Sequence, residues 1–80
     1  MKVQVLLFAS YREKAGVGRL RLDLDDGATV GDLACTMRAK FPGLPEPERI
    51  VVAVNNEYQE HDFVLSDGDE VALIPPVSGG

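Results

Sequence analysis

The most reactive group that this sequence offers is the carboxylate of its last residue, Gly80. Gly79 and Gly80 have no side-chain carbon, so the chain end can pass through a channel too narrow for other residues. A carboxylate is a poor electrophile at neutral pH, so acyl transfer from it requires activation, most simply by ATP to an acyl-adenylate. Sulfide then gives a thiocarboxylate, whereas an amine gives an isopeptide bond. Both products stay open here, as does a frayed end without function, since terminal glycines are commonly disordered.

Two further residues could do chemistry, but the sequence gives neither of them a chemical partner. His61 lies between Glu60 and Asp62 with no paired nucleophile, so we expect a solvent-exposed surface histidine. Cys35 is the only cysteine, and its helical position is away from the apolar stripe, so we expect structural or semi-exposed filler. One Cys and one His fall short of a zinc or iron-sulfur site. No bound metal or cofactor is therefore expected.

Length and composition indicate one small soluble domain. The chain has 80 residues, of which 45% are hydrophobic and 26% are charged. A chain this short has room for one core. No apolar run approaches membrane-spanning length, and the apolar stretch at residues 3–9 lacks the basic flank and cleavage site of a signal peptide. We therefore expect a cytoplasmic protein without a membrane partner.

The charge of the chain is uneven along the sequence. All 8 Lys and Arg lie at or before Arg49, whereas Asp and Glu occur throughout, so the part from Ile50 onward carries only acidic charge. An acidic surface repels phosphate backbones, so no nucleic-acid partner is expected. It favours a partner protein whose receiving surface is basic, with a solvated acidic face as the alternative.

Hydrophobic periodicity predicts four strands, at residues 2–8, 19–24, 50–54 and 70–74, and a short strand within 58–65. A single helix is predicted from Val30 to Phe41, with Thr29 as its cap and Asp32 completing a capping box. Residues 10–16 break the strand pattern and are expected to be the wide loop of a hairpin. Because residues 50–54 are dense in β-branched side chains, that strand is expected to be buried on both faces.

These elements predict an α+β fold, with a mixed sheet of about five strands packed on one main helix. The alternating strand residues and the helix stripe give the predicted core: Val3, Val5, Leu7, Leu20, Leu22, Leu24, Leu33, Met37, Val71 and Leu73. One helix covers only one face of the sheet, so Phe8, Tyr58 and Ile74 are expected on the open face, together with Leu6. A cluster of exposed apolar residues there would mark a partner-binding surface, and loops that fold over and cover these residues are the alternative.

The chain is expected to divide into a domain at residues 1–74 and a protruding, flexible tail at residues 75–80. Prolines end a strand because they remove backbone donors and fix φ. The tail spans at most about 20 Å when extended, which is enough to place its end inside another protein. Its residues are Pro75, Pro76, Val77, Ser78, Gly79 and Gly80.

Three segments together resemble the small, sulfur-carrying subunits of molybdopterin synthase, a family with the ubiquitin-like β-grasp fold. They are residues 8–16 (FASYREKAG), 52–58 (VAVNNEY) and 67–80 (DGDEVALIPPVSGG). The last segment is the most specific, because sulfur carriers of thiamine synthesis share the glycine pair but are usually shorter and lack this ending. Ser10 and Tyr11 differ from the usual residues of the family.

The resemblance implies a mechanism and partners. Gly80 would be adenylated by a ubiquitin-activating-like enzyme that uses ATP, and a sulfurtransferase would supply persulfide sulfur to form a thiocarboxylate. The tail would then enter the large synthase subunit and donate sulfur to cyclic pyranopterin monophosphate. The complex would be a heterotetramer of two small and two large subunits, with the catalytic side chains on the large one. The alternatives are a ubiquitin-like protein modifier, a thiamine-type sulfur carrier and a plain interaction module.

Overall fold

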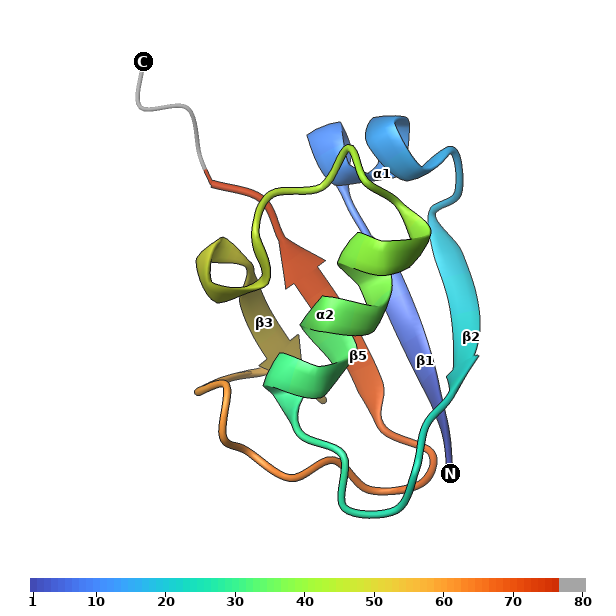
Figure 1. Ribbon diagram of the computed structural model, residues 1–80, viewed down its shortest axis with the longest axis vertical. Helices are drawn as coiled ribbons and strands as arrows, with labels where there is room; N and C mark the ends of the chain where they lie inside the picture. Colours follow the sequence, from blue (N-terminus) through green and yellow to red (C-terminus); the bar gives the residue numbers. More distant parts are fainter. Residues whose placement is uncertain (77–80) are drawn as a thin grey trace.

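A computed structural model describes residues 1–76, and the predicted tail residues Val77, Ser78, Gly79 and Gly80 lie outside the described part. The described chain forms one five-stranded sheet, and α2 crosses one face of it (Figure 1). In chain order the elements are β1 (Lys2–Leu7), α1 (Ala9–Ala15), β2 (Arg19–Asp23), α2 (Val30–Lys40), the 3-10 helix η1 (Pro47–Arg49), β3 (Val51–Val54), β4 (Glu57–Gln59) and β5 (Glu70–Ile74). The predicted mixed sheet with one main helix is confirmed.

The strand order of the sheet is β2-β1-β5-β3-β4. Strand β1 pairs antiparallel with β2 and parallel with β5, and β3 pairs antiparallel with both β5 and β4. The β3–β4 hairpin turns at Asn55 and Asn56, whose φ values are 51° and 73°. Two positive φ values match the right-handed twist of a hairpin, and Asn tolerates this conformation.

The core lies between α2 and the facing side of the sheet. Eight of the ten predicted core residues are buried, and Leu20 and Leu24 are only partly buried, packed against the core. Leu20 lies on β2, and as an edge strand β2 has a neighbouring strand on one side only. The loops and short elements add buried residues that periodicity did not predict: Tyr11, Ala28, Leu44, Ile50 and Leu65.

The predicted capping box at the start of α2 is confirmed. The backbone N–H of Asp32 donates to Thr29 Oγ1 at 3.2 Å, and the backbone N–H of Thr29 donates to Asp32 Oδ2 at 2.9 Å. These bonds satisfy two donors that a bare helix end would leave open. The helix ends at Lys40, before the predicted break at Pro42.

Two predictions about local structure are wrong. Residues 10–16 are not a wide loop, because Ala9–Ala15 form α1, which ends at Gly16 with φ 79°. Tyr11 is the single buried residue of α1, too little to produce a helical pattern in the sequence. Strand β3 is buried on one face only, since Val52 and Val54 are buried while Val51 is 50% exposed.

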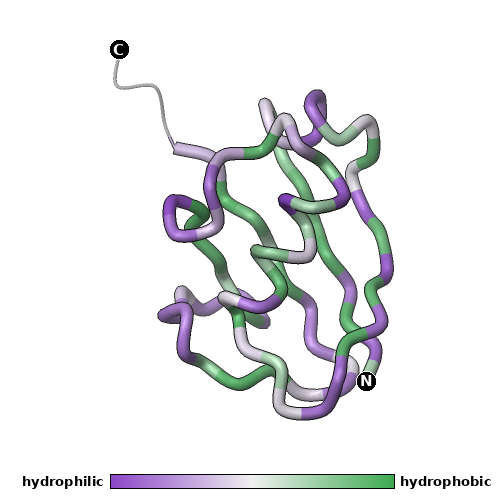
Figure 2. Tube along the Cα trace, in the orientation of Figure 1, coloured by the Kyte–Doolittle hydropathy of each residue, from purple (hydrophilic) through white to green (hydrophobic). Residues whose placement is uncertain are grey.

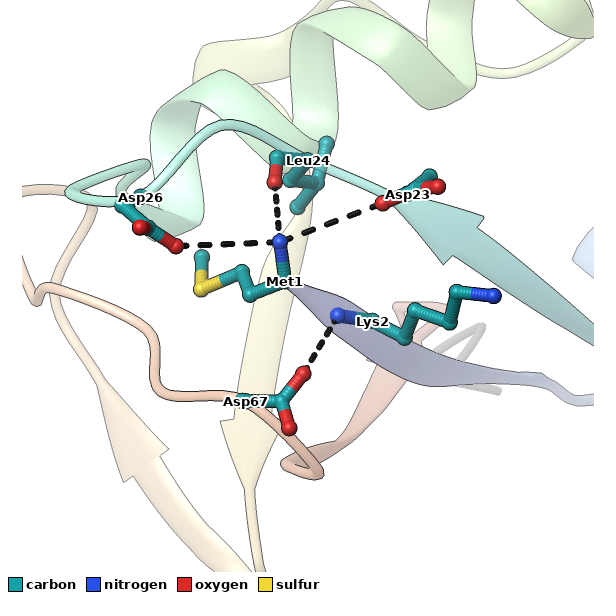
Figure 3. A network of polar contacts seen from close by, with 6 residues as sticks. All are labelled: Met1, Lys2, Asp23, Leu24, Asp26 and Asp67. Carbon is teal, nitrogen blue, oxygen red and sulfur yellow. Dashed lines mark hydrogen bonds and ion pairs between the residues drawn. The ribbon is translucent and has the colours of Figure 1, made fainter.

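The start of β1 is fixed by polar contacts with two turns (Figure 3). The amino group of Met1 donates to the Leu24 carbonyl at 2.7 Å and lies 3.7 Å from Asp26 Oδ1. The backbone N–H of Lys2 donates to Asp67 Oδ1 at 2.7 Å. The turns before α2 and before β5 are thereby held at the same end of the sheet.

Hydrophobic residues recur along the strands, and the loops mix hydrophilic and hydrophobic segments (Figure 2). Within residues 1–76, no helix is long and apolar enough to cross a membrane.

Candidate protein-docking face

Among residues 1–76, the sheet face opposite α2 has no helix lying across it (Figure 1). Successive side chains of a strand point to opposite faces, so the residues between the buried positions all lie on this open face. We call it the docking face, and define it by the apolar residues Leu6, Phe8, Val51, Ala53, Tyr58, Ala72 and Ile74.

The strand register places four of these residues in one row across the sheet. Leu6 pairs with Ala72, Ala72 with Ala53, and Ala53 with Tyr58. Directly paired residues have Cβ atoms about 4.5 to 5.5 Å apart, so the row is continuous. The small side chains of Ala53 and Ala72 form a shallow depression in the middle of this row. Tyr58, which is 72% exposed, lies at its β4 end.

A second row lies where β5 leads into the tail. Ile74 pairs with Val51. Leu7 pairs with Leu73 in the parallel β1–β5 pair, so the next residues along the two chains, Phe8 and Ile74, are also neighbours. Phe8 is 46% exposed and Ile74 is half-buried. The structure therefore places Phe8, Tyr58 and Ile74 on one face, with Ile74 directly before Pro75. Their role in partner binding remains a prediction.

Sequence reasoning missed Val51, Ala53 and Ala72 as members of this face. Residues 50–54 are all apolar, so their alternation between faces leaves no trace in the sequence. The same applies to Ala72, which lies between Val71 and Leu73 in an apolar run. Their pairing with Leu6 and Tyr58 across the sheet could have identified Ala53 and Ala72, but this pairing is known only once the strand order is known.

The backbone around Phe8 fixes where its ring lies. Phe8 is extended, with φ −125° and ψ 156°, and its carbonyl accepts from the N–H groups of Tyr11 at 3.0 Å and Arg12 at 3.3 Å. The next residue, Ala9, has φ 47°, a left-handed conformation that an alanine rarely adopts. β1 ends at Leu7, and this turn at Phe8 and Ala9 starts α1. A strained residue thus stands beside a candidate binding residue, as strained residues commonly do.

A cavity of about 510 Å³ adjoins the docking face at the β3–β4 side and is lined by Val51 and Tyr58 of the face, and by Glu48, Glu60 and His61. His61 is half-buried, so its prediction as a solvent-exposed residue is wrong. Its Nε2 lies 2.9 Å from the carbonyl oxygen of Ile50, and because a carbonyl only accepts, Nε2 carries the proton. The side chain therefore fastens the loop after β4 to the start of β3.

The remaining candidates contribute no chemistry to this face. Cys35 is exposed on α2, across the sheet from it. In residues 1–76, no three His, Cys, Asp or Glu side chains come together as a metal site. Burial raises the pKa of the Tyr11 phenol above its ordinary value of 10.0, so Tyr11 is neutral at physiological pH and acts as a core residue.

Comparison with known proteins identifies the family. The ThiS family model matches residues 5–80, which include most of β1, every later element and the whole tail. The chain belongs to the ThiS family.

Among its curated relatives, a Chlamydomonas reinhardtii protein named molybdopterin synthase sulfur carrier subunit is 45% identical over 83 residues, covering 100% of both chains. Small archaeal modifier protein 3 of Haloferax volcanii is 33% identical over 92 residues, again covering 100% of both. The resemblance inferred from the sequence is confirmed, and one family contains proteins with both kinds of name.

Solved structures show the same fold. SAMP1 of Haloferax volcanii superposes with a TM-score of 0.87 and 35% identity, covering 100% of both chains. A ubiquitin of Caldiarchaeum subterraneum gives 0.71 and 24%, covering 100% of this ThiS chain and 98% of that one. A chain in the complex of subunits 1 and 2 of the Helicobacter pylori molybdopterin-converting factor gives 0.64 and 21%, covering 100% of both. The fold is the ubiquitin-like β-grasp.

Proposed function

We propose that this ThiS chain is the sulfur carrier subunit of a molybdopterin synthase, with Gly80 as the C-terminal residue that carries the sulfur. The observation that carries the proposal is full-length identity of 45% to a protein with that name. Two features agree with it. The chain ends in the glycine pair, and the candidate docking face extends to Ile74, at the base of the tail.

The proposed chemistry has two steps on Gly80. A partner adenylating enzyme binds ATP, the Gly80 carboxylate attacks the α-phosphate, and pyrophosphate leaves. The terminal sulfur of a persulfide on a sulfurtransferase then attacks the acyl carbon and AMP leaves. A thiol then attacks the cysteine sulfur of the resulting acyl disulfide, which forms a disulfide with the sulfurtransferase, breaks the original S–S bond and releases Gly80 as the thiocarboxylate. Its sulfur passes to cyclic pyranopterin monophosphate in the large subunit, and we place these steps in the cytoplasm.

In this proposal the chain itself binds and positions, and its partners supply the catalytic side chains. The docking face holds a partner by apolar contact, centred on the low row of Ala53 and Ala72 with Phe8 and Tyr58 standing beside it. Pro75 and Pro76 stiffen the base of the tail. The tail, at most about 20 Å long, then delivers Gly80 to an active site away from the domain.

A second function is favoured by the Haloferax relatives, whose names include small archaeal modifier protein. A protein modifier uses the same adenylate but passes it to a lysine amine, so an isopeptide bond forms in place of a thiocarboxylate. Intact mass spectrometry separates the two after incubation with activating enzyme, ATP and a sulfur donor. Exchange of one oxygen for sulfur supports the carrier, and Gly80 linked to lysine supports the modifier.

The first prediction is that deleting Gly80 abolishes charging with sulfur but not folding. The deletion leaves an equivalent carboxylate on Gly79 and shortens the tether by roughly 3.3 Å, so the loss comes from misplacement in the partner site. Gly80→Ala keeps the length and adds only a Cβ beside the reacting carbon, and it should also be charged poorly. Both variants should still bind the large subunit. Wild-type charging of the deletion variant would contradict the terminal-carboxylate mechanism.

A further inference from the structure

The charged side chains of the folded domain separate toward two opposite ends of the sheet. The end where β5 leads to Pro75 includes α1, the start of β2, the last turn of α2 and η1 (Figure 1). We call it the tail end. It carries six basic side chains, Arg12, Lys14, Arg19, Arg38, Lys40 and Arg49, and four acidic ones, Glu13, Glu46, Glu48 and Glu60, the last of which lines a cavity together with Glu48 and Val51.

Contacts between these elements bring the basic residues to this end although they are spread over the sequence. The Leu7 N–H donates to the Gly18 carbonyl at 3.0 Å, which joins the end of β1 to the start of β2. A Cβ built on Gly43 would lie 3.5 Å from Cβ of Lys14, so the loop after α2 contacts α1. Arg49 stands two residues before Val51, the partner of Ile74 in the last pair of β5.

The opposite end gathers the turns around the starts of β1, β4, β5 and α2, and it is acidic. Its carboxylates are Asp23, Asp25, Asp26, Asp32, Glu57, Asp67, Asp69 and Glu70. The Met1 amino group and the Lys2 side chain are the positive groups among them, and Figure 3 shows the Met1 amino group beside Asp26 and the Lys2 side chain extending away from Asp67. Asn55 Nδ2 also donates to Asp69 Oδ1 at 2.9 Å, which ties the β3–β4 turn to the same end.

The two sets of charge do not neutralise each other inside the domain. Within residues 1–76, the ion pairs shorter than 4.0 Å are those of the Met1 amino group, and no Lys or Arg side chain has a carboxylate partner. Five of the six basic side chains at the tail end are exposed, and Arg38 is half-buried. The domain therefore has a positively charged end and a negatively charged end, and the tail leaves from the positive one.

We propose that the basic tail end docks on an acidic protein surface that surrounds the opening into which the partner receives the tail. This rests on the proposed function. It reverses the expectation from the sequence, in which the acidic second half of the chain favoured a basic receiving surface. The domain carries a net charge of −5, which disfavours a long polyanion, whereas an acidic rim on a protein touches only the positive end.

The field of such a domain orients it before contact. An acidic rim attracts the tail end and repels the opposite end, so encounters occur with the tail leading. Steering of this kind raises association rates by about 10- to 1000-fold and weakens with salt. The screening length is about 10 Å at 0.1 M salt and about 3 Å at 1 M, so salt separates steering from apolar contact.

The test compares association rates of the full chain with the large synthase subunit by stopped-flow fluorescence. The variant Lys14→Glu/Lys40→Glu reverses two exposed charges at the tail end that lie outside the docking face. Its matched control is Asp25→Lys/Glu57→Lys, two exposed side chains at the opposite end. At low salt we expect the first variant to associate about tenfold more slowly than wild type, and the control to associate as fast or faster. The difference should vanish near 1 M salt.

Other results of this experiment would contradict the proposed acidic rim. An unchanged association rate for Lys14→Glu/Lys40→Glu overturns the acidic rim, and a faster rate shows that the rim is basic. Slower association of the control by the same factor also overturns it.

Two further results concern the partner itself. If the wild-type chain binds a short DNA duplex and the first variant does not, the tail end is assigned to nucleic acid. A wild-type chain that binds no large subunit contradicts the proposed function, and this inference with it. Lys14→Gln/Lys40→Gln, expected to show about half the logarithmic effect, replaces the first variant if that one unfolds.

Discussion

The side chain of Phe8 is positioned by its backbone neighbours more than by packing of its own. Nearly half of its surface is exposed, and it lies between the end of β1 at Leu7 and the left-handed Ala9. Its carbonyl is held by two N–H groups of α1. An exposed aromatic ring whose backbone is already fixed loses little freedom on binding, which suits the partner contact proposed for it.

Changing this residue should therefore affect binding and not folding. Phe8→Asp removes an apolar contact worth about 1.5 to 3 kcal/mol, so affinity for the large subunit should fall by about one to two decades. The thermal unfolding midpoint should hardly move. Val64→Asp is the matched control, because Val64 is 56% exposed and lies in the loop that bridges to Thr29 beside α2. Titration calorimetry measures both, and equal losses for the two variants would show that Phe8 has no special role.

At the scale of elements, helix α2 is the longest helix on the core side of the sheet, beside the buried Tyr11 of α1 and the buried loop residues. Its buried residues Val30, Leu33, Ala34 and Met37 recur at helical spacing and face the strands. The capping box sets where that helix starts and hence which residues face inward. The cap therefore contributes to the stability of the whole domain, because α2 supplies four of the buried core residues.

Thr29→Ala should lower the free energy of unfolding by about 1 kcal/mol, since the N–H of Asp32 loses its acceptor. For a domain of this size the midpoint should fall by about 4 to 8 °C. Thr36→Ala makes the same change in the same helix, where the hydroxyl donates to the Asp32 carbonyl without capping the helix. Its effect should stay within about 0.5 kcal/mol. Urea denaturation checks both, and equal effects would show that the cap contributes nothing specific.

The same elements show what the sequence could predict. Strands β1 and β5 and helix α2 carry clear periodicity or a cap, and they were predicted to within a few residues. Helix α1 was missed because one buried Tyr11 makes no pattern, and the exposed face of β3 was missed because all its residues are apolar. Of the docking face, Phe8 and Ile74 follow from alternation alone. The charge separation could not be predicted, because it depends on which turns meet in space.

At the scale of the whole molecule, the two central strands come from opposite ends of the sequence. β1 lies between β2 and β5, and β5 lies between β1 and β3, so β5 joins two hairpins that would otherwise be separate. Without β5, β1 and β3 each expose an unpaired strand edge. The docking face also loses Ala72 and Ile74, which connect its β1 residues to its β3 residues. The docking face is thus completed by the same strand that leads to the tail.

A chain that ends before Glu70 should consequently fail to fold. The fragment of residues 1–69 should show no hydrogen-exchange protection in β1 or β3, because both depend on pairing with β5. The fragment of residues 1–76, which contains every described element, should be protected like the full chain. Protection of β1 and β3 in the shorter fragment would show that the β1–β2 hairpin and α2 are stable by themselves.

This topology also bears on synthesis at the ribosome. Contacts between distant parts of a sequence form late, and here the centre of the sheet must wait until residues 70–74 have left the exit tunnel. Gly80 follows the last of these by only six positions in the sequence. In the proposed function Gly80 is the C-terminal residue that is activated, so completion of the native sheet and release of its carboxylate would nearly coincide. An activating enzyme that recognises the folded face would ignore nascent and truncated chains, so activation by ATP would be reserved for finished molecules.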